Sequence, residues 1–160
     1  MRCKVVGVGG TFDEFHKGHR ALLKKAFEVS ERVIIGLATY DLVQKMEKPH
    51  KVAPYAVRLG ELKSFLRKKG LNGRAKIIPI KTAYGNTLTN KQIEGIVVSR
   101  ETASTASEIN EKRKAKGFKP LRIIVIDMVP AYNRAPISTT RIRFMEIDRE
   151  GHQLKHKYEP

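Results

Sequence analysis

The chain has 160 residues, of which 41% are hydrophobic, so it fits one domain with one core and argues against a multidomain machine. Lys and Arg number 32 against 16 Asp and Glu, and the resulting net charge of +16 favours an anionic ligand without choosing among phosphates, nucleic acid and membranes. The single cysteine, Cys3, excludes an internal disulfide and a four-cysteine zinc site, and it leads us to expect a cytoplasmic protein. No apolar run approaches the ~20 residues of a membrane span, and we expect a soluble, non-secreted chain.

The first half of the chain predicts two strands, each followed by a helix. A β-branched run over residues 3–9 ends in glycines and precedes a helical pattern over 17–28. His19 extends the apolar face of that helix by one turn, so we expect it to point at the rim of a sheet. Residues 32–38 are apolar on both faces, as in a parallel strand covered on each side. Residues 54–70 predict a helix with proline at its start and glycine at its end.

The second half predicts three strands and two helices. The strands are expected over residues 75–80, 95–98 and 122–127, and the helices over 101–116 and 138–148. Alternating strands and helices indicate an α/β fold of the doubly wound type, with a five-stranded parallel sheet in a single domain over 1–160 and a polar tail over 150–160. The irregular segments 85–89 and 130–136 both follow strands, and ligands bind at that carboxyl edge of an open parallel sheet.

The first motif that carries chemistry is the run GGTFDEFHKGH over residues 9–19. A glycine turn after a strand exposes backbone N–H groups beside a helix N-terminus, and these groups favour an anion. His16 and His19 place two imidazoles near the same point. The motif therefore predicts phosphate recognition.

Other interpretations of this motif are weaker. A zinc site needs more ligands than two histidines, and no Cys, His or Glu partner stands at a motif spacing, so we predict no resident metal. Nucleophilic catalysis lacks a candidate, because Cys3 lies at the wrong end of its strand and no Gly-x-Ser-x-Gly turn exists. The glycines are not spaced as in the dinucleotide-binding G-x-G-x-x-G pattern. Two ordinary histidines at a helix start remain the plain alternative.

The second motif is PISTTRIR over residues 136–143. Three hydroxyl side chains, two guanidiniums and the N–H groups of a starting helix give a second candidate cradle for phosphates. Taken alone the motif is weak, because Ser and Thr are also common helix caps.

Together the two motifs resemble the signatures of the nucleotidylyltransferase superfamily, G-x-F-D-x-x-H-x-G-H and I-S-[ST]-T-x-x-[RK], in the expected order. Class I aminoacyl-tRNA synthetases share His-x-Gly-His, but this length leaves no room for an anticodon-reading domain, and KMEK at 45–48 comes too early for their lysine loop. Further segments resemble phosphopantetheine adenylyltransferases of the archaeal type, similar to the adenylyltransferase half of eukaryotic bifunctional coenzyme A synthase. These segments are YDLVQK at 40–45, PYAVR at 54–58, YG at 84–85 and VVSRET at 97–102, followed by Ile109, Asn110 and Arg113. Thr105 and Ala106 stand where glycines are expected.

The resemblance implies a Rossmann-like fold and the transfer of AMP from ATP to 4′-phosphopantetheine, giving dephospho-coenzyme A and pyrophosphate. The nucleophile is a phosphate monoester with a second pKa of ~6, already an anion at neutral pH, so no general base is expected. Mg²⁺ is implied as a cofactor held mainly by the ATP phosphates. The implied partners are these two substrates, with no nucleic acid and no membrane, and the oligomeric state stays open.

The resemblance also implies roles for individual residues. His16, His19, Lys45 and Arg143 are expected to be catalytic, with Lys48 and Lys51 close enough to compete with Lys45 for the acceptor phosphate. The expected ATP contacts are Gly9, Gly10, His19, Ser99, Arg100, Glu101, Ser138, Thr139, Thr140 and Arg143. The expected phosphopantetheine contacts are Thr11, Phe12, Lys45 and Arg58, although Arg58 is equally well explained by a structural ion pair.

Two other functions compete with this one. The same motifs suit a cytidylyltransferase that acts on glycerol 3-phosphate or a related phosphate. The net charge of +16 also allows a nucleic-acid-binding protein with a retired active site. Against the second, aromatic residues make up only 7%, and the Lys and Arg residues are spread along the chain instead of forming one stripe.

Overall fold

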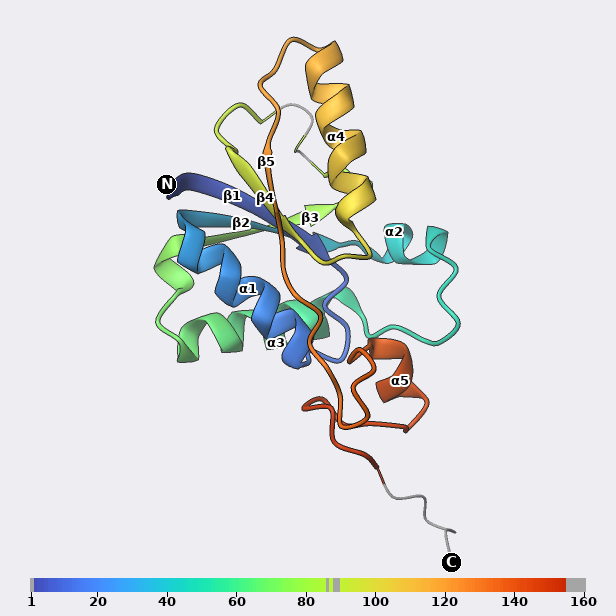
Figure 1. Ribbon diagram of the computed structural model, residues 1–160. Helices are drawn as coiled ribbons and strands as arrows, with labels where there is room; N and C mark the ends of the chain where they lie inside the picture. Colours follow the sequence, from blue (N-terminus) through green and yellow to red (C-terminus); the bar gives the residue numbers. More distant parts are fainter. Residues whose placement is uncertain (1, 86, 88–89, 155–160) are drawn as a thin grey trace, which may run out of the picture.

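The computed structural model describes residues 2–85, 87 and 90–154, which form a five-stranded sheet with helices around it (Figure 1). The strands are β1 (Cys3–Gly10), β2 (Ser30–Ala38), β3 (Ala75–Ile80), β4 (Gly95–Val98) and β5 (Arg122–Val125). Across the sheet their order is β3-β2-β1-β4-β5, and each neighbouring pair is parallel. The chain therefore crosses from one side of β1 to the other between β3 and β4, and this reversal is where open parallel sheets bind ligands.

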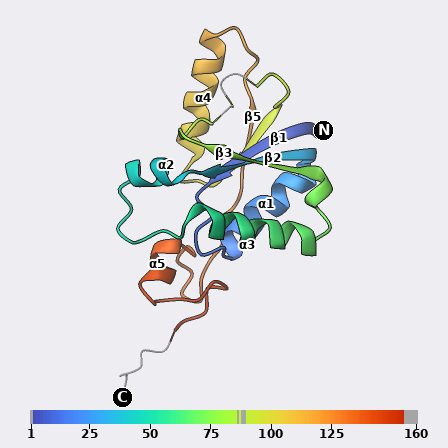
Figure 2. The same cartoon turned by 180° about the vertical axis from the view of Figure 1, so that it is seen from behind.

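Helices cover both faces of the sheet. The helices α1 (Lys17–Val29) and α3 (Tyr55–Lys68) lie on one face and α4 (Ala103–Ala115) on the other (Figures 1 and 2). Three short helices complete the fold: α2 (Tyr40–Lys45), η1 (Asn72–Arg74) and α5 (Thr139–Arg143). The predicted α/β class, Rossmann-like and doubly wound with a five-stranded parallel sheet in a single domain, is confirmed.

The two faces are packed differently. Under α1 and α3 the main core includes the fully buried Leu23 and Leu62, which meet strand residues such as Val33. On the other face α4 is polar and buries only Ala106, Ile109 and Arg113. Hydrogen bonds from its side chains to the backbone add to this apolar contact: the Asn110 amide donates to Leu121 O at 2.9 Å, and Arg113 donates to the carbonyl of Lys119 at 2.8 Å. This lighter apolar packing leaves room for a cavity beside α4.

The expectation of a last helix over 138–148 is wrong beyond its first turn. The α5 helix ends at Arg143, and Met145 adopts a positive φ of 62° that stops any continuation. Ile142 and Ile147, whose spacing suggested a helix face, are both buried in a separate small cluster with Ala131 and Ile137. The segment after Met145 instead folds back as a turn closed by the antiparallel bridge between Ile147 and Gln153.

Other differences from the expected elements are small. β2 begins at Ser30, α4 begins at Ala103 and β5 ends at Val125, each two residues from the predicted boundary. The α2 helix, capped by the Thr39 hydroxyl, was not expected. Within the expected tail, residues 150–154 pack against the domain. Residues 155–160 of the tail, and residues 86, 88 and 89 of the expected loop, lie outside the described residues. Within the described part of the chain, no helix has the length and apolar character needed to cross a membrane.

Candidate functional site

The turn between β1 and α1, residues 11–16, adopts a conformation that costs energy. Phe12 and Glu14 have φ values of 51° and 50°, in the left-handed region that non-glycine residues avoid at a cost of about 1–2 kcal/mol each. Ring contacts hold the turn in place. The centroid of the buried Phe12 ring lies 5.3 Å from that of His19, and the Phe15 centroid lies 5.1 Å from that of Phe65 in α3. A strained turn held this firmly is typical of a functional site.

His16 and His19 form a stacked pair at the start of α1. Their ring centroids lie 3.7 Å apart with an interplanar angle of 18°. The Nδ1 atom of His16 accepts from the backbone N–H groups of Gly18 and His19, and Nδ1 of His19 accepts from the N–H of His16 at 3.2 Å. Because each Nδ1 lone pair is used in this way, the proton of each neutral ring belongs on Nε2. The pair thus offers two N–H donors from fixed positions.

Both imidazoles are neutral at pH 7. Burial lowers the pKa of His16 to about 4, and the positive charges of Arg20 and Arg149 act in the same direction. Burial also lowers the pKa of His19 well below its ordinary value, helped by His16 and by the charge of Lys48. The two rings therefore act as hydrogen-bond donors and not as cations.

Asp13 joins the first motif to the second. Its carboxylate is 1% exposed and receives a two-pronged contact from Arg143, with Nη2 to Oδ1 at 2.8 Å and Nε to Oδ2 at 3.2 Å. The backbone N–H of Ala53 donates to the same group at 3.0 Å. Burial alone would raise the pKa of Asp13, but the bonds from Arg143 and Ala53 outweigh it and hold the pKa below its usual value. Asp13 is therefore a buried, charged anchor.

The second motif begins α5 and contacts the first motif directly. The Ser138 hydroxyl caps the helix by accepting from Arg141 N at 3.2 Å, and the Thr139 hydroxyl donates to Asp13 O at 3.0 Å. Arg143 also contacts Glu14, with Nη1 and Oε1 3.2 Å apart. The two motifs thus meet at the carboxyl edge of the sheet through Asp13 and Thr139, which are 126 residues apart in the sequence (Figure 1).

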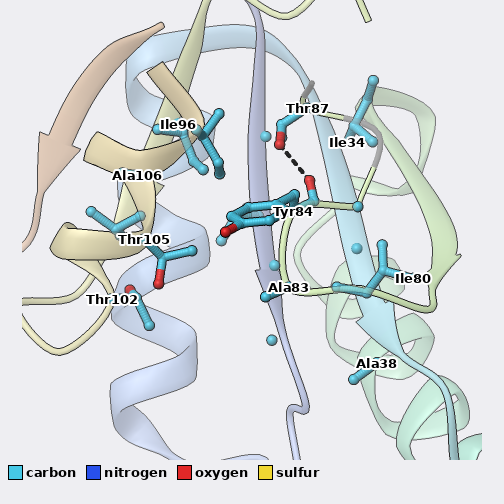
Figure 3. A pocket seen from close by; sticks show the side chains of 18 of the residues that line it. Ile34, Ala38, Ile80, Ala83, Tyr84, Thr87, Ile96, Thr102, Thr105 and Ala106 are labelled. Atoms are coloured by element: carbon cyan, nitrogen blue, oxygen red, sulfur yellow. Dashed lines mark hydrogen bonds between the residues drawn. The ribbon is translucent and has the colours of Figure 1, made fainter. Parts of the chain in front are cut away.

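An apolar cavity of about 260 Å³ opens beside this edge, between α4 and the turn that follows β3 (Figure 3). Its floor is made by glycines of β1 and β2, which leave the backbone open to a ligand: Gly7, Gly9, Gly10 and Gly36. Tyr84 extends from the turn toward Thr105 and Ala106, and its hydroxyl donates to Glu108 of α4 at 3.0 Å. At the other end the cavity reaches Met46, whose sulfur lies 3.8 Å from the Thr11 hydroxyl. The cavity therefore leads to the strained turn.

Comparison with known proteins agrees with this geometry. Residues 8–144 match the family model described as cytidylyltransferase-like. The chain is 46% identical to the phosphopantetheine adenylyltransferase of Methanothermobacter thermautotrophicus, over 94% of this chain and 90% of that one. The chain belongs to the phosphopantetheine adenylyltransferase family. The enzyme of that name from Pyrococcus abyssi is 42% identical, over 98% and 99% of the two chains. A crystal structure of a protein of unknown function from Archaeoglobus fulgidus superposes with a TM-score of 0.70 at 31% identity, over 84% of this chain and 99% of that one.

The lysines expected near the acceptor phosphate of this family member differ in their placement. Lys45 ends α2, and the side chains of Lys45, Lys48 and Lys51 are all exposed. Lys48 is the one of the three whose charge contributes to the lowered pKa of His19. Which of the three lysines binds the acceptor phosphate stays a prediction.

Arg58, the other expected acceptor contact, is turned onto the chain itself. Its side chain is 2% exposed, and its guanidinium donates to the carbonyls of Ala53, Ala38 and Thr11 at 2.8, 2.8 and 3.0 Å. These bonds brace the strained turn through Thr11. Direct contact between Arg58 and phosphopantetheine stays a prediction, and the contacts in the structure are structural ones.

The expected nucleotide contacts after β4 lie at the same edge of the sheet. Ser99 is half-buried, and Arg100 and Glu101 are exposed. The Thr102 hydroxyl receives the backbone N–H of Ser99 at 3.2 Å and makes no capping bond to α4. Thr102 lines the cavity, and its hydroxyl does not cap the first N–H groups of α4.

Sequence reasoning missed the carboxylates and the late arginine of the site. Asp13 lies within the first signature, and that was its only signal. Glu14 carried no signal beyond its place in the same run. Arg149, which contacts Glu14 at 3.0 Å, lies after the second motif, where nothing in the pattern suggested a role.

Proposed function

We propose that the chain transfers AMP from ATP to 4′-phosphopantetheine, releasing dephospho-coenzyme A and pyrophosphate. The observation that carries the proposal is the contact between the two motifs, in which Thr139 and Arg143 of one hold Asp13 of the other. The relatives of this name at 46% and 42% identity support the choice of substrates.

The reaction forms a bond between an oxygen of the acceptor phosphate and the α-phosphorus of ATP, and it breaks the bridge to the β-phosphate. The acceptor phosphate has a second pKa of about 6, so it reaches neutral pH as an anion and needs no base. The enzyme must instead bring two anions together in line and stabilise the charge that develops on the transferred group. Neutral donors of fixed direction meet this need.

In this proposal the Nε2–H groups of His16 and His19 donate to oxygens of the α-phosphate. Thr11 and the Phe12 backbone hold the acceptor phosphate together with Lys45, and Lys48 and Lys51 are the alternatives. The polyphosphate of ATP is assigned to Gly9, Gly10, Ser138, Thr139, Thr140 and Arg143, and the rest of the nucleotide to Ser99, Arg100 and Glu101. We place Mg²⁺ on the ATP phosphates, because Asp13 and Glu14 are already paired with arginines.

The apolar cavity completes the assignment of substrates. Its wall at Met46 contacts Thr11, so a ligand whose phosphate is held at Thr11 would extend its uncharged part into the cavity. The pantetheine arm is such a part, and burying it beside the glycine floor would supply apolar binding energy. The nucleotide is then left with the β4 edge and α5, and its phosphates share Gly9 and Gly10 with the cavity floor. We also keep the expectation of a reducing, cytoplasmic setting for this reaction.

A pyrophosphate-release assay tests the proposal and its rivals together. The protein is incubated with 4′-phosphopantetheine or glycerol 3-phosphate, each combined with ATP or CTP and Mg²⁺. We expect pyrophosphate only from 4′-phosphopantetheine with ATP. Release from glycerol 3-phosphate with CTP would instead establish the cytidylyltransferase, which the cytidylyltransferase-like family match keeps as the second candidate. Steeply salt-dependent binding to nucleic acid with no release in any arm would favour the binding protein.

A further inference from the structure

The segment that follows the second motif folds back onto the start of α1. Asp148 begins a turn in which its carboxylate accepts from the backbone N–H groups of Glu150 and His152 at 2.9 and 2.8 Å. Its own N–H donates to His152 O at 2.9 Å, and the bridge between Ile147 and Gln153 closes the turn. This 148–152 turn presents Arg149 and Glu150 at its tip.

Arg149 contacts three separate parts of the molecule. Its carbonyl accepts from Lys17 N, the first residue of α1, at 2.9 Å. Its guanidinium donates from Nε to Glu14 of the strained turn at 3.0 Å. The same guanidinium donates to both carboxylate oxygens of Glu61 in α3, from Nη1 to Oε2 at 3.0 Å and from Nη2 to Oε1 at 3.2 Å. One side chain therefore ties the turn that carries His16 to a rigid helix.

The chemistry of these contacts requires arginine. Bridging two carboxylates in one plane uses the fork of the guanidinium, which lysine lacks. The side chains of Arg149, Glu14 and Glu61 are 44%, 20% and 34% exposed, so the ion pairs contribute little to the overall free energy of unfolding. The ion pairs instead fix the conformation of the turn, because Glu14 holds a positive φ of 50° two residues before His16.

We propose that Arg149 is a positioning residue, which holds the 12–16 turn through Glu14 so that the Nε2–H groups of His16 and His19 keep the direction needed for transfer. Without it the strained turn would relax toward ordinary backbone angles and carry the imidazole pair with it. A misplacement of about 1 Å at a reacting group can cost on the order of 100-fold in rate.

The kinetic part of the test rests on the proposed function and compares Arg149→Met with a matched control. The control is Glu150→Gln, which removes the negative charge from the neighbouring ion pair between the 148–152 turn and Arg20 of α1 but leaves Glu14 and Glu61 paired with Arg149. We expect Arg149→Met to lower kcat by roughly 10- to 100-fold with the KM for ATP within about twofold. Arg149→Lys should recover only part of the rate, and Glu150→Gln should behave like wild type.

A second measurement needs no substrate, so it stays valid whatever reaction the enzyme performs. In ¹⁵N-labelled protein, the imidazole signals of His16 and His19 report which ring nitrogen carries the proton, and His16→Gln and His19→Gln variants assign them. We expect the Nε2–H form for both rings in wild type and in Glu150→Gln. In Arg149→Met we expect the signals to move toward a mixture of the two forms.

Either of two results would overturn the proposal. One is an Arg149→Met protein with wild-type kcat and unchanged imidazole signals. The other is an equal loss of rate in Glu150→Gln, which would mean that the 148–152 turn acts by general packing. Should Arg149→Met fail to fold, Glu61→Gln carries the same test from the surface of α3, with a smaller loss of kcat expected and wild-type kcat as the contradicting result.

Discussion

The strained turn and the apolar cavity lie side by side at the carboxyl edge of the sheet, yet they are built by opposite means. The turn is held by charged pairs and by ring contacts, with Arg143 on Asp13 and Arg149 on Glu14. The cavity is lined by glycines and isoleucines, and Tyr84 is one of its few polar side chains. The difference indicates that one edge of the sheet holds two sites with separate roles, one in orientation and one in binding. In the proposed function, fixed donors orient the reacting phosphates, while burial of an uncharged arm supplies affinity. Changes in the turn should therefore affect turnover, and changes in the cavity should affect binding.

The largest effect is expected from the donor pair itself. His19→Ala removes one Nε2–H group and also the Nδ1 acceptor of His16 N. We expect kcat to fall by at least ~100-fold while the KM for ATP changes little, because the donor acts mainly on the transition state. Steady-state kinetics measure both quantities. A turnover number close to wild type would remove His19 from the mechanism.

Arg143 tests the joint between the two motifs. In Arg143→Met the polyphosphate loses a charge-assisted donor, for which we expect about 10- to 100-fold weaker binding of ATP and pyrophosphate. The buried Asp13 carboxylate also loses its partner, so the melting temperature should fall as well. Isothermal titration and thermal unfolding separate the two effects. Unchanged affinity for both ligands would show that the second motif does not bind phosphate.

The buried, neutral state of His16 predicts how stability depends on pH. Between about pH 6.5 and about 4 the unfolded chain binds a proton at His16 that the folded chain does not, so stability falls as the pH is lowered through this range. The full effect is worth about 3 kcal/mol.

Urea unfolding from pH 7.5 to 4.5 checks this by comparing wild type with His16→Gln, which should lack that part of the dependence. Equal slopes in wild type and His16→Gln would contradict a buried neutral imidazole.

The smallest effect is expected from the cavity. A Cβ at Gly7 would lie 3.8 Å from Ile93 and Thr87, an ordinary contact, so Gly7→Ala should fold normally and occupy part of the cavity floor. We expect the KM for 4′-phosphopantetheine to rise about 3- to 10-fold, with kcat and the KM for ATP near wild type. A larger KM for ATP instead would assign the cavity to the nucleotide.

The sequence predicted the sheet because the strands are short runs rich in Val and Ile and because α1 and α3 have apolar residues at the helical period. It failed where tertiary contacts decide the backbone. Ile142 and Ile147 suggested one helix face, but they are buried together by a turn, with Met145 between them 63% exposed. The six-residue helix α2 is too short for its period to be recognised.

The site was predicted unevenly for similar reasons. The histidines could be placed together because their capping contacts are local, within three residues. The pairing of Asp13 with Arg143 joins residues 130 apart, and no local pattern indicates such a contact. For Arg58 the sequence left a phosphopantetheine contact and a structural ion pair equally open. The structure gives it three backbone carbonyl partners, and the phosphopantetheine contact stays a prediction.

The most direct test of the central claim is to follow the α-phosphorus of ATP. Wild-type protein is mixed with 4′-phosphopantetheine and [α-³²P]ATP, and the products are separated. The label should appear in dephospho-coenzyme A and not in pyrophosphate, and His19→Ala should form labelled product at least ~100-fold more slowly. Label that stays in ATP with wild-type protein, or equal transfer by the variant, would contradict the account.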